Sequence, residues 1–216
     1  MKSKILLPIA ILFFATTTVN AQINEGRYLL GGSISYGNAK NQQSVGSKTE
    51  TFYSNIQFGK VVKDNSVVGI IASYSFANFN YSANKTNQFS GGVFYRKYKS
   101  FAKNFYLFGE ADALYNHSQS TQGIFQTGND ATRDISNGGG LSFTPGISYS
   151  LCKRMQIELS MPNIVSISYA GTKNETTTSF SNSISTVKGN NFSGSVNISS
   201  NFLYGFGIGF KFFLGK

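Results

Sequence analysis

The sequence contains no tryptophan, one cysteine, one histidine and three prolines among 216 residues. Because Cys152 is the only cysteine, no intramolecular disulfide can form. The HExxH, CxxC and P-loop motifs of metal and nucleotide sites are absent. One catalytic arrangement stays open, a Ser-His-Asp triad of His117 with Asp130 or Asp134 in the same predicted loop. The sequence predicts a non-enzymatic protein without a bound metal or cofactor.

Charged residues are also scarce, at 13% against about 25% in typical soluble domains. The formal net charge is +10, yet the cations are scattered singly through serine- and asparagine-rich stretches, without a basic run. Nucleic acid is therefore not an expected partner. Anionic lipid headgroups or surface sugars suit this scatter better.

Long hydrophobic runs are missing, apart from one near the N-terminus. Residues 1–21 begin with Lys2 and Lys4, continue through an apolar stretch and end on small residues at Ala21. This pattern predicts a cleaved signal peptide over 1–21, because the apolar stretch is shorter than the roughly 20 residues that span a bilayer. We expect export, and one domain over residues 22–216. No later stretch predicts a transmembrane helix.

Strict alternation of apolar and polar residues dominates the rest of the chain. It marks eight segments, at residues 27–36, 51–62, 66–76, 88–98, 104–116, 141–151, 155–169 and 203–214. Short connections (63–65, 99–103, 153–154) alternate with long polar ones (37–50, 77–87, 117–140, 170–202). This is typical of an eight-stranded antiparallel up-and-down β-barrel crossing an outer membrane, with short turns and both termini in the periplasm. One alternative stays open: the last strand begins near Phe192, and residues 176–188 pair with it as a hairpin.

The size of the side chains indicates which face of each strand points outward. An eight-stranded barrel has an interior just wide enough to be filled by side chains, so we expect the bulky face to lie outside. In the last strand, Gly205, Gly207 and Gly209 alternate with large apolar residues. The predicted lipid-facing residues of this strand are Phe206, Ile208, Phe210 and Phe212.

Five charged residues fall on the small-residue face of their strands. They are Arg96, Glu110, Asp112, Glu158 and Lys211. A Lys or Arg facing lipid costs about 2–4 kcal/mol at the midplane, so a position in the lumen is strongly favoured. Enclosed charges normally pair, which favours a salt-bridged plug. A proton or ion path, or a catalytic carboxylate pair, are the functional alternatives.

Four stretches carry a family resemblance: IQFGKVVKDNSVVGI, FYRKYKSFAKNFYLFGEADALY, LSFTPGISYSLCKRMQIELSM and the terminal FGIGFKFFL. They resemble the outer-membrane β-barrel domain proteins of Bacteroidota, akin to small barrels of the porin family. The resemblance implies a barrel fold and an integral outer-membrane location, with outer-membrane lipid as its surroundings. It also implies that barrel-assembly machinery reads the aromatic last strand during biogenesis. It implies no catalytic activity.

Four functions remain at this stage. The leading one is a non-enzymatic barrel with a filled interior, whose long extracellular loops serve structural, adhesive or partner-contact roles. The alternatives are a narrow channel for small solutes, an enzyme acting on lipid or peptide at the outer rim, and a soluble lipocalin-like carrier.

Overall fold

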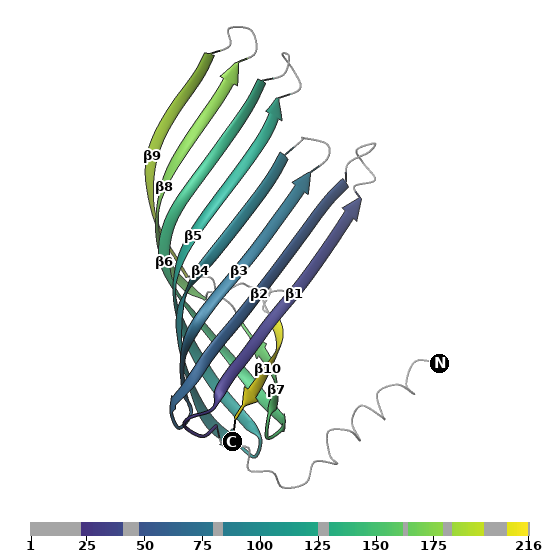
Figure 1. Cartoon of the computed structure of the whole chain (residues 1–216), viewed down its shortest axis with the longest axis vertical. Helices are drawn as coiled ribbons and strands as arrows, with labels where there is room; N and C mark the ends of the chain where they lie inside the picture. Colours follow the sequence, from purple (N-terminus) through teal and green to yellow (C-terminus); the bar gives the residue numbers. More distant parts are fainter. Residues whose placement is uncertain are drawn as a thin grey trace, which may run out of the picture.

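The computed structural model describes residues 23–40, 48–79, 84–124, 130–161, 164–178, 183–196 and 207–215, and within these ranges the chain forms antiparallel strands (Figure 1). The strands are β1 (Tyr28–Lys40), β2 (Lys48–Lys63), β3 (Ser66–Phe79), β4 (Asn84–Ala102), β5 (Phe105–Ile124), β6 (Asp130–Cys152), β7 (Met155–Ser160), β8 (Val165–Thr178), β9 (Ser183–Val196) and β10 (Gly207–Leu214). The predicted signal peptide lies outside the described residues, and so do Gly205 and Phe206 of the predicted last strand.

Eight of the strands close into a ring. The sheet order runs β5-β4-β3-β2-β1-β10-β7-β6, and β6 pairs back onto β5. This closed, eight-stranded antiparallel barrel confirms the predicted fold class. Above the ring, β8 replaces β7 as the partner of β6, and β9 pairs with β8. The upper wall is thus made of long hairpins that rise beyond the closed part (Figure 1).

The long connections predicted from the sequence are wrong in extent. β5 and β6 run far into residues 117–140, with pairs from Phe105↔Tyr149 up to Ile124↔Asp130. Likewise, β8 and β9 form a hairpin that starts at Val165 and extends into residues 170–202. The open alternative is wrong in its pairing: Phe192 pairs with Tyr169 in β9, and residues 176–188 cover the end of β8 and the first part of β9. Apolar alternation stops where both faces of a strand meet water, but backbone pairing continues, and Ser and Thr residues support it.

The short turns at the other end match the expectation closely. They consist of Asp64–Asn65, Lys103–Asn104 and Lys153–Arg154. Asn65 and Asn104 have positive φ values of 60° and 65°, a conformation that asparagine tolerates better than most residues. A register shift lies beside each turn. Their backbone carbonyls also accept hydrogen bonds from neighbouring strands, as in Tyr98 N–H to Asn65 O at 2.8 Å.

Large side chains fill the interior at the turn end, which corrects the expectation of an interior with only small and charged residues. The buried inward residues are Leu29, Val61, Val67, Phe94, Tyr98, Tyr106, Phe108 and Phe213. Two of the rings, Phe94 and Phe108, fit because glycines lie beside them. A Cβ at Gly69 would lie 2.6 Å from Phe94 Cε1, and one at Gly146 would lie 2.4 Å from Phe108 Cζ. The lumen therefore alternates large and small residues, as narrow barrels do.

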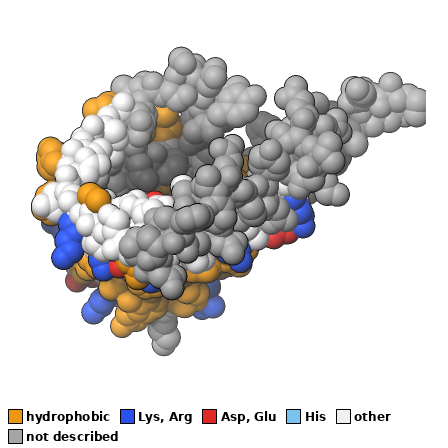
Figure 2. All heavy atoms as spheres, turned by 90° about the horizontal axis from the view of Figure 1, so that it is seen from above, with side chains coloured by type: hydrophobic (Ala, Val, Ile, Leu, Met, Phe, Trp, Pro, Cys, Tyr) orange, Lys and Arg blue, Asp and Glu red, His pale blue; other side chains and the backbone are white. Residues whose placement is uncertain are grey.

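The outer face of the closed part is apolar. Ile34, Ile70 and Ile208 are 80%, 61% and 68% exposed there, and in Figure 2 hydrophobic side chains gather on the lower part of the visible wall. Aromatic residues flank this band, with pairs such as Tyr28–Phe58 at 5.8 Å and Phe105–Tyr149 at 4.6 Å between ring centroids. A soluble barrel would have the opposite arrangement.

Candidate functional site

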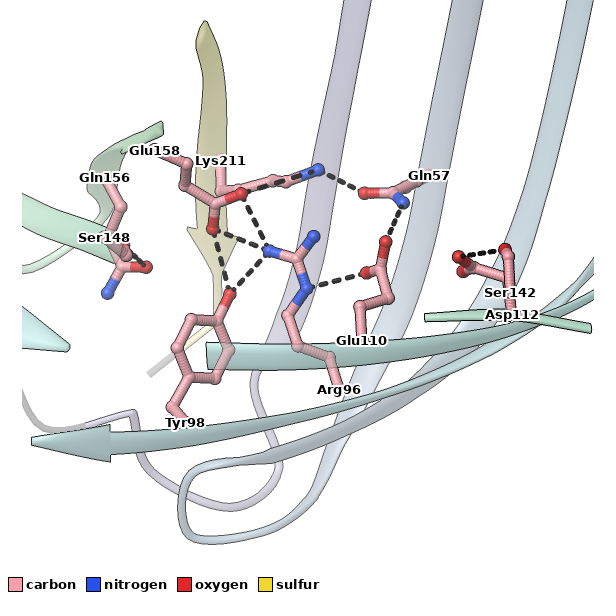
Figure 3. A network of polar contacts seen from close by, with 10 residues as sticks. All are labelled: Gln57, Arg96, Tyr98, Glu110, Asp112, Ser142, Ser148, Gln156, Glu158 and Lys211. Carbon is pink, nitrogen blue, oxygen red and sulfur yellow. Dashed lines mark hydrogen bonds and ion pairs between the residues drawn. The ribbon is translucent and has the colours of Figure 1, made fainter. Parts of the chain in front are cut away.

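The structure brings the five charged residues predicted for the lumen together inside the closed ring (Figure 3). We call Arg96, Glu110, Asp112, Glu158 and Lys211 the buried charge cluster. They come from β4, β5, β7 and β10, and none is more than 7% exposed. Along each strand these residues alternate with the outward-facing ones, so their side chains point into the lumen. Charged side chains from four strands therefore meet inside the lumen.

Arg96 lies at the centre of this cluster. Its Nε donates to Glu110 Oε2 at 2.7 Å, and its Nη1 donates to Glu158 Oε1 and Oε2 at 2.6 and 2.8 Å. The guanidinium carbon lies 4.4 Å from the ring centroid of Phe108, within the range of a cation–π contact. Tyr98 completes this part: its hydroxyl accepts from Arg96 Nη1 at 3.0 Å and donates to Glu158 Oε1 at 3.2 Å. Both carboxylates are thus held by one cation.

Lys211 joins the cluster through Gln57, a residue that the sequence analysis missed. Lys211 Nζ donates to Gln57 Oε1, and Gln57 Nε2 donates to Glu110 Oε1 at 3.0 Å. Lys211 Nζ also lies 4.0 Å from Glu158 Oε2. Gly31 leaves room for this lysine, since a Cβ there would lie 2.4 Å from Lys211 Cδ. Gln57 alternates with the outward residues Ile56 and Phe58 of β2, and this pattern could have predicted that its side chain points into the lumen.

A second polar group lies nearer the turns. Ser148 Oγ donates to Gln156 Oε1 at 2.8 Å, and Gln156 Nε2 donates to Ser150 Oγ at 3.0 Å. All three side chains are buried. Together with the buried charge cluster, they satisfy the polar groups on the inner wall of β6 and β7, as buried polar groups generally require.

Asp112 is the least satisfied member of the buried charge cluster. Its Oδ2 accepts from Ser142 Oγ at 3.2 Å, but its Oδ1 has no hydrogen-bond partner among the described residues. The cluster holds two cations and three carboxylates, and both cations lie against Glu110 or Glu158. Asp112 is thus the carboxylate without a cation of its own.

This geometry predicts that Asp112→Asn leaves the free energy of unfolding unchanged or raises it by up to about 1 kcal/mol, because the substitution keeps an acceptor for Ser142 and removes an unpaired buried charge. Urea titration of the folded barrel in detergent micelles measures this. The matched control is Glu110→Gln, which breaks the contact with Arg96 and should destabilise the barrel. A loss above about 1 kcal/mol for Asp112→Asn would show that this carboxylate is well paired.

The arrangement is that of a closed polar plug. Glu110 and Glu158 contact the same guanidinium through charge-assisted hydrogen bonds, and the second oxygen of Glu110 accepts from Gln57, so all four carboxylate oxygens are already in use. Such a network holds β4, β5, β7 and β10 at a fixed spacing across the lumen. It offers neither carboxylate as a free acid or base.

The other candidate chemistry from the sequence is separated by the fold. His117 points outward from β5, with Nδ1 2.6 Å from Asn137 Oδ1. Asp134 lies on the opposite, inward face of β6, where it accepts from Asn174 at 2.5 Å. His117 and Asp134 therefore cannot form a triad, and the side chain of Asp130 lies outside the described residues. Cys152 is free and exposed beside a short turn.

Two further findings concern the described part of the chain. No group of three or more His, Cys, Asp or Glu residues there is arranged to hold a metal ion. Among the same residues, no helix is both long and apolar enough to cross a membrane.

The residues predicted to face lipid on the last strand point outward. Ile208, Phe210 and Phe212 are 68%, 44% and 41% exposed, whereas Lys211 between them is buried. Phe213 is buried as well, because it packs inward against Tyr98 at 6.4 Å between centroids. Phe206 lies outside the described residues.

The upper hairpins carry ion pairs exposed to water. Lys48 contacts Glu50 on β2, and Lys173 Nζ lies 2.5 Å from Glu175 Oε1 on β8. The hydrogen bond that Lys48 donates to Glu50 raises the pKa of Lys48, and the hydrogen bond that Glu175 accepts from Lys173 lowers the pKa of Glu175. These charges lie beyond the apolar band of the outer face.

No protein-family model matches the chain, and a search of curated proteins finds no significant relative. What the protein does must therefore follow from its own geometry.

Proposed function

We propose that the protein is an integral, non-enzymatic outer-membrane β-barrel with a side-chain-filled interior. The observation that carries this proposal is the reversed placement of side chains. Large apolar residues such as Ile34 and Ile70 point outward, and Arg96 and Glu158 are enclosed. In water this arrangement would expose a wide apolar surface, whereas in a bilayer it matches each face to its solvent.

The height of the apolar band agrees with a bilayer. On β5 the outward face runs from Phe105 to Tyr115 without a charged side chain. Ten residue steps of ~3.3 Å cover ~33 Å along the strand, or ~25 Å of height at a tilt of about 40°. Outer-membrane barrels have an apolar band of about 25 Å.

The proposed orientation places the short turns in the periplasm and the upper hairpins outside. The hairpins β1–β2, β3–β4, β5–β6 and β8–β9 would then serve structural, adhesive or partner-contact roles above the membrane. The predicted export signal and the resemblance to Bacteroidota barrels support a location in the outer membrane. We further propose that the barrel-assembly machinery reads the alternating aromatic face of β10 during insertion.

A closed structural barrel is favoured over a channel because the lumen is blocked at the level of Arg96. Side chains from β2, β4, β5, β7 and β10 meet there through hydrogen bonds and ion pairs. Below them, Phe94, Tyr98 and Phe108 fill the turn end. Single-channel recording should accordingly show no conductance steps, and steady conductance would contradict the plug while leaving the membrane location intact.

Adjacent positions on β1 test the proposal. Ile34 and Ser35 are both exposed but lie on opposite faces, so they should differ only in the solvent that they meet. In a Cys152→Ser background, a nitroxide at Ile34→Cys should collide more with oxygen, which concentrates in lipid, and one at Ser35→Cys more with a water-soluble nickel complex. A soluble carrier would expose both labels to nickel. Migration of the unboiled protein as a compact species on a gel verifies folding.

A further inference from the structure

The fold gathers at one end many cations that are scattered along the sequence. Seven exposed basic side chains lie at or beside the short turns, and we call them the basic belt. They are Lys60, Lys63, Lys97, Lys99, Lys103, Lys153 and Arg154. Only two exposed carboxylates of the described chain, Glu25 and Asp64, lie at this end, and Asp64 Oδ1 already accepts from the Glu25 backbone N–H at 3.1 Å. The turn end therefore has a marked excess of positive charge.

The belt differs from the upper hairpins in how its charges are partnered. On the hairpins, Lys48, Lys173 and Arg133 each lie within 4.0 Å of a glutamate, whereas Lys85 and Lys188 make no ion pair with a described residue. Within the described residues, no ion pair joins a side chain of the basic belt to a carboxylate. Lys97 Nζ donates instead to a neutral acceptor, Ser66 Oγ, at 2.8 Å. The positive charge at the turn end is thus available to an outside partner.

The belt lies at the lower edge of the apolar band and overlaps it on β4, where Lys97 lies opposite Gly109 of β5. Lys60 pairs across the strands with Tyr28, and Lys97 follows Tyr95 by two residues on the same outward face. Lys99 is opposite Leu107 on β5. Lysines at this depth lay their methylene stems along apolar surface and extend the ammonium group to headgroup level. Their partner should therefore lie in the plane of the interface.

We propose that the basic belt binds the phosphate groups of anionic phospholipids in the leaflet at the short-turn end. The belt is spread over β2, β4 and the turns after β4 and β6, around the perimeter of the ring instead of on one side. A ring of headgroups fits this distribution better than an acidic protein docked on one patch. The inference rests on the proposed membrane location and assigns a lipid class to one of the two leaflets.

Two charge-matched triple variants test the proposal. The belt variant is Lys60→Gln/Lys99→Gln/Lys153→Gln, and the hairpin control is Lys85→Gln/Lys173→Gln/Lys188→Gln. Both lose the same charge, so any attraction of the unfolded chain to anionic lipid changes equally. The control lysines lie four residues beyond Phe89, Tyr169 and Phe192, or ~13 Å along the strand from the apolar band.

The full chain is folded from urea into phosphatidylcholine vesicles, with or without phosphatidylglycerol of the same chain length. The measured quantity is the ratio of the folding equilibrium constants in the anionic and the neutral vesicles. A lysine near an anionic surface contributes about fivefold, so the belt variant should lower this ratio by on the order of a hundredfold. The hairpin control should have the same ratio as the wild type. In 1 M salt, at which the Debye length is about 3 Å, the difference between the belt variant and the wild type should disappear.

Equal ratios for the two triple variants, or a wild type indifferent to phosphatidylglycerol, would overturn the inference. Retention of the micelle-bound wild type on polyglutamate, without a lipid preference, would overturn it in favour of an acidic protein partner. Failure of the wild type to fold into either vesicle would instead contradict the proposed membrane location, so the two failures are distinguishable.

Discussion

Replacing Arg96 with methionine is expected to lower the free energy of unfolding by about 3–5 kcal/mol, because it leaves buried carboxylates without their cation. Glu110 and Glu158 are 4% exposed and both contact this guanidinium within 2.8 Å. Lys211 cannot replace it, since its Nζ lies 4.0 Å from Glu158 and reaches Glu110 only through Gln57. Urea titration in micelles, read by the gel mobility of unboiled protein, measures the change.

The loss should be largely reversed when the stranded charges are removed too. In Arg96→Met/Glu110→Gln/Glu158→Gln/Lys211→Met the only charge left at this level is Asp112, which has no cation of its own in the wild type either, so most of the stability should return. Lys211 is replaced as well because Glu158→Gln removes its ion-pair partner. Lys97→Gln is the control: it removes a cation from the neighbouring exposed position and should change stability by less than about 0.5 kcal/mol. If Arg96→Met alone costs less than about 1 kcal/mol, the buried charge cluster does not hold the wall together.

The inward placement of Arg96 and Lys211 could be predicted because parity alone decides it. Once alternation identifies the outward face of β4 from Val93 and Tyr95, the face of Arg96 follows. The partners could not be predicted in the same way. Gln57 lies 53 residues from Glu110 and 154 from Lys211 in sequence, and only the closure of the ring brings the three together.

Two features of the fold, the large side chains inside the barrel and the length of the upper strands, could not be predicted from the sequence for physical reasons. Phe94 and Phe108 alternate with outward residues and so should point inward, but their size argued against it. The glycines that make room for them lie on neighbouring strands, which the sequence alone does not place beside them. The extent of the upper strands could not be predicted because hydrophobic alternation indicates an apolar outer face, not backbone pairing. β5 and β6 stay paired as far as Ile124 and Asp130, well beyond the last apolar residues of the band.

The glycines of the inner wall lead to the second large expected effect. Gly69→Ala should lower the free energy of unfolding by about 2–3 kcal/mol, at the upper part of the range for overpacking. A Cβ at this position would lie 2.3 Å from the Phe58 carbonyl oxygen, 2.5 Å from Gly59 Cα and 2.6 Å from Phe94 Cε1. Two of these three atoms belong to the backbone of β2, which is fixed by pairing with β3, so a side-chain movement cannot relieve the contact. The same urea titration measures the loss.

Gly209→Ala provides the matched control, because this inward glycine on β10 has nothing within 4 Å of an added Cβ and should tolerate the change within about 0.5 kcal/mol. Adding Phe94→Leu to Gly69→Ala separates the two sources of crowding. If the backbone of β2 dominates, the shorter side chain restores little; if the ring dominates, most of the stability returns. Equal, small effects at Gly69 and Gly209 would mean that the wall can widen locally. If the wall widens so easily, the hydrogen bonds and ion pairs at Arg96 do not fix the spacing of the strands, and the buried charge cluster would not have the structural role given to it.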